Sequence, residues 1–382
     1  MTTLTREDMD RSVSTKPKQY YDYTLLFLII FLVGFGIVMI SSISAYNATK
    51  YYDDAFLFVK GQLQYAVLGL VAMVGISMFD YHLVTLRFLR VRLVTWFYLI
   101  CVAMQLAVLF VGHSTNGSSR WLELGPIRFQ PSELTKIAVI LLAAFVVQKA
   151  PKILDHFLGF VFVMAIFAPA IGLVLIENLS TAIILVGIVF VICFITSRKK
   201  GYYFISMGVL VVGGALAIFK VSYRAERIDN WLHVETADGG YQILQGLYAI
   251  ASGGWFGKGL GNSIQKLGYI PEVHTDMIFS CICEELGIFG AVCLLALYAI
   301  LLWRIFLIGL HAPDLFGSLI VCGVFVQIAL QVLINVAVVT NSIPATGIPL
   351  PFVSYGGSSL IFTMMEIGMV LSVAKRIDYG NS

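Results

Sequence analysis

The feature that most constrains this chain is the recurrence of apolar stretches, each about 20 residues long, along almost its whole length. A helix of about 20 apolar residues can cross a hydrocarbon core about 30 Å thick. Hydrophobic residues make up 59% of the chain and charged residues 12%, whereas a soluble domain is roughly half apolar and about a quarter charged. The sequence therefore predicts an all-α polytopic integral membrane protein.

The apolar runs predict about ten transmembrane helices. The predicted spans are residues 21–43, 62–80, 93–112, 133–148, 157–176, 181–197, 202–220, 277–303, 316–340 and 357–374. They form one predicted membrane domain, 21–375, between an N-terminal tail, 1–20, and a C-terminal tail, 376–382. The N-terminal tail is polar and lacks the apolar core of a signal peptide, so the first span is expected to insert and stay.

The placement of basic residues predicts the topology. If the N-terminus is cytoplasmic, most of the 25 Lys and Arg residues fall on the cytoplasmic side, clustered at span ends, as the positive-inside rule expects. Both termini are then cytoplasmic. The net charge of +3 adds little to this argument, and no nucleic-acid partner is predicted.

Three long segments are predicted on the outer side of the membrane, and such segments are usually functional. They are residues 113–132, 221–276 and 341–359. The largest is an extracytoplasmic loop between the seventh and eighth spans. Within it, residues 240–254 are apolar on most sides yet too short to span, so we predict an interfacial or re-entrant helix with Gln242 and Gln245 on one face.

An acid and a base stand at the start of the fourth span, in the stretch RWLELGPIRFQPSELTK. Pro131 suits the first turn of a helix, and Glu133 lies where the helix dipole favours an anion. Lys136 follows three residues later on the same face. Ionisable groups at this depth are functional candidates, although a mutual ion pair that locks the span against its neighbours is an alternative compatible with function. Arg120, in the preceding loop, is a candidate ligand or a solvated surface charge.

Three cations share the largest outer loop. Arg224 and Arg227 lie three residues apart, and Lys258 lies in the glycine-rich stretch GGWFGKGLGN. Exposed backbone amides and fixed cations suit phosphate binding. The glycine pattern alone is weak evidence, because these glycines could simply form turns, and it follows no strand, so it does not indicate a dinucleotide-binding fold.

Asp276 lies where this polar loop meets the eighth span. Partial desolvation there would favour its neutral form and move its pKa toward the range useful for proton abstraction. Asp is also among the best N-cap residues, so the local sequence leaves a helix cap and a catalytic base equally possible. Glu284 and Glu285 lie deeper in the same span, where pairing with a buried Lys or Arg is a better explanation than direct chemistry.

The third outer segment, IPATGIPLPFVSYGGSS, is rich in proline and glycine, which fix a loop whose backbone can approach a ligand closely. A purely structural kinked loop is the alternative. The residues predicted to shape this loop are Pro349, Pro351, Ser354, Gly356 and Gly357.

Together these stretches resemble the SEDS family of shape, elongation, division and sporulation proteins, the FtsW/RodA/SpoVE group. The signatures are RWLELGPIRFQPSELTK, then GYQILQ followed by IASGGWFGKGLGNSIQKLGYIPEVHTDMIF and EELG, and finally PATGIPLPFVSYGGSS. The resemblance covers nearly the whole chain and favours the division or sporulation branch. The chain departs from the family's Pro-Asp-Leu-Gly-Thr run, where it has ENLST, so no chemistry is assigned to Asn178.

The resemblance implies a peptidoglycan glycosyltransferase that polymerises lipid II at the outer face of the bacterial cytoplasmic membrane. It implies that Asp276 is the essential aspartate, and we predict that it acts as general base in an inverting reaction that releases undecaprenyl pyrophosphate. The residues predicted to bind the substrate or its pyrophosphate are Arg120, Glu133, Lys136, Arg224, Arg227, Gln245 and Lys258. No protein metal site is predicted, although a divalent cation, Mg or Mn, could assist at the pyrophosphate.

The implied partners are lipid II, the nascent glycan strand, membrane lipid, a class B penicillin-binding protein and other divisome or elongation proteins, and the implied place is the division septum. Two rival functions remain at this stage. A lipid II flippase would move lipid without forming bonds, although its sites would be expected near the membrane midplane. A non-catalytic scaffold for a penicillin-binding protein would tolerate changes at Asp276.

Overall fold

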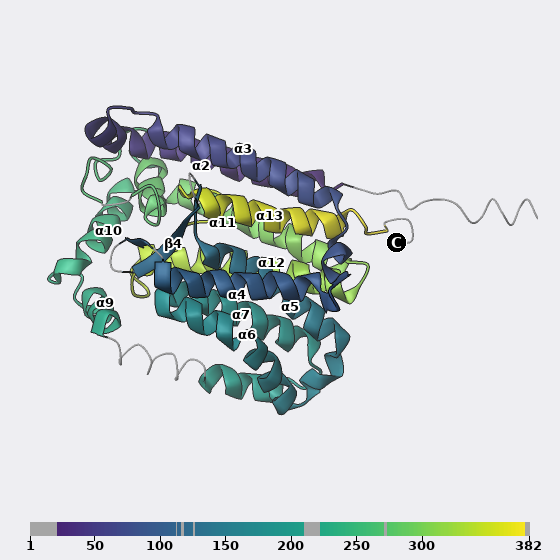
Figure 1. Cartoon of the computed structure of the whole chain (residues 1–382). Helices are drawn as coiled ribbons and strands as arrows, with labels where there is room; N and C mark the ends of the chain where they lie inside the picture. The colour runs from purple at the N-terminus through teal and green to yellow at the C-terminus, as the bar shows by residue number, and fades with distance from the viewer. Residues whose placement is uncertain are drawn as a thin grey trace, which may run out of the picture.

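The structure is a computed structural model that describes residues 21–111, 113–115, 118–124, 127–209, 222–270 and 273–378. In this part of the chain, nine helices are long and apolar enough to cross a membrane, and they run side by side as a bundle (Figure 1). They are α2 (Tyr23–Tyr52), α3 (Leu57–Met78), α4 (Leu93–Val111), α5 (Pro131–Lys149), α6 (Phe157–Glu177), α7 (Leu179–Thr196), α11 (Ile278–Leu310), α12 (Leu315–Val339) and α13 (Gly357–Ala374). The predicted all-α membrane class is confirmed. The predicted seventh span, 202–220, lies mostly outside the described residues, and its described part, 202–209, is helical.

Two helices run well beyond their predicted spans. Helix α2 continues to Tyr52, where residue 43 was the predicted end, and α11 continues to Leu310 rather than 303. Hydropathy marks only the part of a helix that needs an apolar surface, whereas backbone hydrogen bonding continues the helix through polar residues. Helix α2 stops where Asp53 adopts a left-handed conformation, with φ of 57°, and its N–H donates to the Thr49 carbonyl.

The helices differ in how deeply they lie in the bundle. In an apolar stretch of 18 residues within each helix, the buried share of residues is 83% in α5, 67% in α13, 61% in α12 and 56% in α7. The corresponding share is 22% in α3 and 28% in both α4 and α6, so their exposed aliphatic side chains are those that lipid would cover. Helix α5 is therefore a central helix, and polar groups at its outer end face protein.

Close helix contacts depend on glycines, as is common between membrane helices. A Cβ added to Gly368 of α13 would lie 2.6 Å from the carbonyl oxygen of Met73 in α3, and one added to Gly69 would lie 2.5 Å from Met364 Sδ. Both distances are too short for real atoms. The missing side chains let α3 and α13 pack backbone to backbone.

The three predicted outer segments gather at one end of the bundle, on the left in Figure 1. The first was predicted as a long loop, and in this respect the prediction was wrong. It forms an antiparallel sheet in the order β3-β4-β5, with strands β3 (His113–Thr115), β4 (Ser118–Leu124) and β5 (Ile127–Phe129). Each strand is too short for its alternation to stand out beside long apolar helices.

The longest outer segment contains α9 (Ser222–Leu232), the short helix η3 (Asp238–Gly240) and α10 (Tyr241–Gly253). The predicted short helix over residues 240–254 is confirmed as α10. The third outer segment, between α12 and α13, is described as turns and extended chain.

The opposite end of the bundle holds the short connections, which are η1 (Tyr81–Thr85), β1 (Arg87–Phe88), β2 (Val91–Arg92) and η2 (Pro151–Asp155). Ion pairs tie distant helices together there. Arg304 Nε lies 2.8 Å from Asp22 Oδ2, which joins α11 to the start of α2, and Arg376 Nε lies 3.5 Å from Asp80 Oδ2. These basic residues lie on the side predicted to be cytoplasmic.

Helix α11 is broken at Gly287, where φ is 70° and ψ is −172°. The backbone of the loop after α10 fills the break, because the N–H groups of Lys258 and Gly259 donate to the carbonyls of Glu284 and Glu285 at 2.9 Å. Only glycine adopts this conformation readily. The break therefore fastens the outer loop to the spanning helix at a defined level.

Candidate active site

A cavity of about 200 Å³ opens among the outer ends of the central helices. Its walls come from β4, the first turns of α5 and α7, the residues before α11, the last turns of α12, and the segment that leads into α13. The ionisable and polar side chains that line it include Glu133, Lys136, Asn178, Asp276, Gln331 and Tyr355. Segments separated by more than 200 residues in the sequence therefore meet in one polar cavity.

Three of the predicted catalytic and substrate-binding residues, Asp276, Glu133 and Lys136, line this same cavity. Lys136 Nζ lies 2.9 Å from Glu133 Oε2, and their side chains are 1% and 7% exposed. The predicted ion pair at the start of α5 is therefore present. Removing one partner from a buried pair costs about 3–5 kcal/mol, because the other charge is left uncompensated. The pair thus holds a fixed charge distribution in the cavity wall.

Asp276 stands just before α11 and receives hydrogen bonds from two directions. Its Oδ1 accepts from Gln242 Nε2 at 3.4 Å and from Thr275 Oγ1 at 3.3 Å. Its main-chain carbonyl accepts from Asn335 Nδ2 at 2.9 Å. The N-cap of α11 is Met277, without a side-chain cap bond, so the alternative that Asp276 caps this helix is wrong.

The predicted loop-shaping residues surround the same cavity. Pro349, Gly356 and Gly357 line it directly. Ser354 Oγ accepts a hydrogen bond from the Leu350 N–H at 2.8 Å, which closes a turn inside the segment. A Cβ on Gly357 would lie 2.7 Å from the ring of Tyr65, so a glycine is required where α13 begins.

Two more contacts fix this segment. The Pro351 carbonyl accepts a hydrogen bond from the hydroxyl of Tyr298 in α11. Asn335 Nδ2 donates to the Ile348 carbonyl at 2.8 Å as well as to that of Asp276. The Asn335 carboxamide of α12 therefore fixes the position of Asp276 relative to the loop before α13.

Tyr355 adds a phenol to the cavity. Burial raises the pKa of Tyr355 above its ordinary value, so the hydroxyl remains a neutral donor at physiological pH. Its ring packs 5.3 Å from that of His274 and 5.2 Å from that of Phe58. Tyr355 was not selected from the sequence, because only its place in the glycine-rich segment marks it there.

The other predicted ligands whose side chains the structure describes do not line this cavity. Arg227 lines a second cavity, where its Nη1 donates to the Ala345 carbonyl at 2.8 Å. Lys258 Nζ lies 2.7 Å from Glu284 Oε1. Gln245 lies on α10 outside both linings. The side chains of Arg120 and Arg224 lie outside the described residues, and their predicted roles stay predictions.

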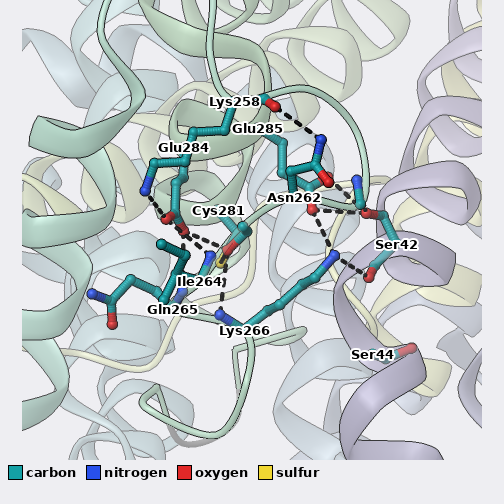
Figure 2. Close-up of polar contacts among 12 residues, drawn as sticks. Ser42, Ser44, Lys258, Asn262, Ile264, Gln265, Lys266, Cys281, Glu284 and Glu285 are labelled. Carbon is teal, nitrogen blue, oxygen red and sulfur yellow. Dashed lines mark hydrogen bonds and ion pairs between the residues drawn. The ribbon is translucent and has the colours of Figure 1, made fainter.

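The two acids in the eighth span were predicted to pair with a buried Lys or Arg, and both pair with lysines, of which Lys266 is buried and Lys258 is 28% exposed. Figure 2 shows Glu284 and Glu285 pointing into a cluster with loop residues and the first span. Lys266 Nζ lies 3.0 Å from Glu285 Oε1, and Lys258 pairs with Glu284. Ser42 Oγ of α2 donates to both Glu285 oxygens, at 2.8 and 2.7 Å. These carboxylates connect α2, the outer loop and α11.

Besides Tyr355, sequence reasoning missed Asn178 and Gln331 in the cavity wall. Asn178 caps α7, where its Oδ1 accepts from the N–H groups of Ser180 and Thr181 at 3.1 and 3.3 Å, and it also lines the cavity. Gln331 lines it from α12. The available signal was a polar residue, at the start of an apolar run for Asn178 and within one for Gln331.

Comparisons with known proteins agree with this architecture. Residues 23–379 match the family described as "Cell cycle protein", FTSW_RODA_SPOVE. The chain is 39% identical to Stage V sporulation protein E of Bacillus subtilis, over 96% of this chain and 100% of that one. It is 36% identical to a probable peptidoglycan glycosyltransferase FtsW of Geobacter sp., over 94% and 97% of the two chains.

Solved structures show the same fold. A chain from a peptidoglycan synthase complex, described as coordinating polymerization and crosslinking, superimposes with a TM-score of 0.77 at 27% identity, over 94% of this chain and 99% of that one. The rod shape determining protein RodA of Thermus thermophilus gives a TM-score of 0.68 at 27% identity, over 94% and 98%. The ordered motifs and these matches together show that the chain belongs to the FtsW/RodA/SpoVE family of membrane proteins.

Proposed function

We propose that this protein is a peptidoglycan glycosyltransferase that polymerises lipid II at the outer face of the cytoplasmic membrane. The observation that carries the proposal is one cavity, at the outer end of the bundle, that Asp276 shares with the buried pair Glu133–Lys136. Relatives named as peptidoglycan glycosyltransferases support it. In lipid II the reactive sugar carbon carries a pyrophosphate tied to a lipid, so the catalytic groups must lie near the membrane surface.

The carboxylate of Asp276 is the proposed general base. It takes the proton from the 4-hydroxyl of the acceptor sugar while that oxygen attacks C1 of the donor sugar. The C1–oxygen bond to the lipid pyrophosphate breaks, and the electron pair leaves with undecaprenyl pyrophosphate. Attack from the face opposite the leaving group inverts C1 and gives a β-1,4 link. Gln242 and Thr275, which donate to Asp276 Oδ1, hold the carboxylate in position for this transfer.

The leaving group develops concentrated negative charge, which fixed cations and dipoles stabilise. Among the described residues that line the cavity, Lys136 is the cation. The ion pair with Glu133 holds its ammonium group at the wall. Lys258 has a different role, because it neutralises the buried carboxylate of Glu284. Arg120 and Arg224 remain proposed ligands of the pyrophosphate from the outer loops.

A divalent cation, Mg or Mn, stays a prediction. The described residues contain no group of three or more His, Cys, Asp or Glu side chains placed to hold a metal ion. A cation that takes part would then be held chiefly by the pyrophosphate oxygens. Its contribution is tested by the rate of polymerisation with and without a chelator, followed by readdition of Mg²⁺ or Mn²⁺.

A class B penicillin-binding protein is the proposed partner. The support is that one similar solved chain belongs to a peptidoglycan synthase complex described as coordinating polymerization and crosslinking. Other divisome or elongation proteins and the division septum are proposed as its setting, because the relatives named SpoVE and FtsW point to the sporulation or division branch.

The test is polymerisation of lipid II by the purified protein, alone and with its cognate penicillin-binding protein, for the wild type and Asp276→Asn. Loss of a general base typically lowers the rate about 10²–10⁴-fold. Asn keeps the size of the side chain, so thermal unfolding should match the wild type. Polymerisation by Asp276→Asn at the normal rate would exclude this role.

The same assay separates the rival functions. A flippase would move fluorescent lipid II between leaflets of a vesicle without making polymer. A scaffold would leave polymerisation to its partner, so Asp276→Asn would act like the wild type in the complex. Polymer made only with wild-type protein supports the enzyme and excludes both rivals.

A further inference from the structure

A second cavity of about 200 Å³ lies beside the first, outside the spanning helices. It is formed by α9, the start of α10 and residues 341–345. The lining side chains that can form hydrogen bonds are Arg227, Asn230, Trp231, Gln242 and Asn341.

Helix α9 is docked so that its polar face forms one wall of the cavity. Trp231 Nε1 donates to the Asn341 carbonyl at 2.9 Å, and Arg227 Nη1 donates to the Ala345 carbonyl at 2.8 Å. A Cβ on Gly239 would lie 2.1 Å from Asn230 Nδ2. The glycine therefore leaves the room in which the Asn230 carboxamide sits. Several independent contacts build the cavity.

The chemistry of the lining differs from that of the first cavity. The described lining residues provide three carboxamides, one indole and one guanidinium, and no carboxylate. Carboxamides both donate and accept hydrogen bonds, as the hydroxyl and acetamido groups of a sugar do. An indole adds an apolar face beside a polar edge. A phosphate site would instead be expected to concentrate cations and oriented N–H donors.

Two structural links join this cavity to the proposed catalytic carboxylate. Gln242 lines the second cavity, and its Nε2 lies 3.4 Å from Oδ1 of Asp276, which lines the first. The segment after α12 also lines both, with Ala345 in the second cavity and Gly347 in the first. A polymerase needs two substrate sites that meet at the reacting atoms, and the contact between Gln242 and Asp276 connects these two cavities.

We propose that the second cavity binds the N-acetylated sugar that carries the attacking hydroxyl, while the lipid pyrophosphate donor occupies the cavity of Lys136. The sugar lies against Asn230 and Trp231 and presents its hydroxyl to Asp276 past Gln242. This inference rests on the proposed function, because it assigns the acceptor subsite of that reaction. It also assigns Arg227 to sugar binding rather than to the pyrophosphate.

The test uses chitotetraose, a soluble β-1,4-linked tetramer of N-acetylglucosamine that has neither lipid nor pyrophosphate. Its binding to the full-length protein in nanodiscs is measured for the wild type, Asn230→Ala, Asn230→Asp and Asp229→Asn. Asp229 is the matched control, because it is on the same helix, 69% exposed, and pairs with His233 rather than lining the cavity. Thermal unfolding of each variant shows whether it is folded.

We expect chitotetraose to bind the wild type and Asp229→Asn equally. Both changes at Asn230 should weaken binding about tenfold, roughly the loss of one or two hydrogen bonds. In the polymerisation assay they should raise the KM for lipid II about tenfold and leave kcat within about twofold, because no reacting group is removed. Folded Asn230 variants that bind chitotetraose like the wild type, or a wild type that does not bind it, would overturn the proposal.

Failure of this proposal and failure of the proposed function give different results. Asp276→Asn should still bind chitotetraose while it loses polymerisation. If the wild type polymerises lipid II and the Asn230 variants have the same KM as the wild type, the acceptor subsite is excluded and the proposed glycosyltransferase activity stands. If the wild type binds chitotetraose, the Asn230 variants bind it more weakly, and the wild type makes no polymer, the sugar site stands and the proposed function is excluded.

Discussion

Lys266→Met tests most directly how the outer loop is held on the spanning helices. Lys266 Nζ lies 3.0 Å from Glu285 Oε1 and donates to the Ser42 carbonyl at 3.1 Å. The Lys266 and Glu285 side chains are 8% and 0% exposed. Methionine has a similar length and keeps the packing of the stem. The substitution therefore removes one charge and strands the carboxylate of Glu285 away from water.

The expected loss of unfolding free energy is about 3–5 kcal/mol, because the charge left behind is buried and uncompensated. The hydroxyl of Ser42, which donates to both carboxylate oxygens, offsets part of this and favours the lower end. In the double variant Lys266→Met/Glu285→Gln neither charge remains, so most of the stability should return. Lys60→Met is the matched control, because Lys60 and Asp54 are 64% and 37% exposed and such pairs contribute about 0–1 kcal/mol.

The assay is reversible unfolding in mixed micelles with increasing denaturing detergent, followed by circular dichroism. The order of stability should be wild type and Lys60→Met highest, the double variant next, and Lys266→Met lowest. A single variant as stable as the Lys60→Met control would show that the pair is effectively solvated. A double variant no more stable than the single one would show that packing, rather than charge, holds the loop.

Three further outcomes follow from the same contacts. Gly287→Ala should lower the unfolding free energy in that assay by more than about 1–3 kcal/mol, the cost of the left-handed backbone conformation alone. The new Cβ would also lie 2.4 Å from the backbone nitrogen of Gly257 and clash with it. Lys136→Met should lose about 3–5 kcal/mol, because it strands the buried carboxylate of Glu133; wild-type stability would contradict this. Burial acts to raise the pKa of Asp80, but hydrogen bonds from His82 outweigh it and hold the pKa below its ordinary value. Asp80 thus stabilises the fold above its unfolded pKa of about 3.9, so Asp80→Asn should be less stable than the wild type at pH 7, and the difference should vanish as the pH falls through the folded pKa.

Sequence reasoning found most of the spanning helices because each needs an apolar surface of nearly fixed length. It also selected Asp276, Glu133 and Lys136, since ionisable groups are unusual at the ends of such helices. Their convergence was not predictable from local sequence, because it depends on how α5 packs among α7, α12 and α13. Local reasoning also left the role of Asp276 undecided between a cap and a base.

Other features required the tertiary structure. The sheet of β3, β4 and β5 is built from strands of three to seven residues, whose alternation is weak beside the apolar runs. Lys266 was not selected because it is one lysine in a polar loop, and only the fold places it against Glu285. The second cavity was missed because its walls come from α9, α10 and a segment about 100 residues further along.

The break in α11 explains how acids can occupy an apolar sequence at the membrane surface. Residues 288–310, after the break at Gly287, form a helix of about 34 Å, which is enough to cross a core of about 30 Å. Residues 278–286 thus exceed what the crossing requires, and α10 and the following loop pack against them. Glu284 and Glu285 are therefore surrounded by polar protein groups rather than lipid. The same arrangement leaves Asp276, just before this extension, near the outer surface, where the proposed lipid-linked substrate would hold its reactive bond.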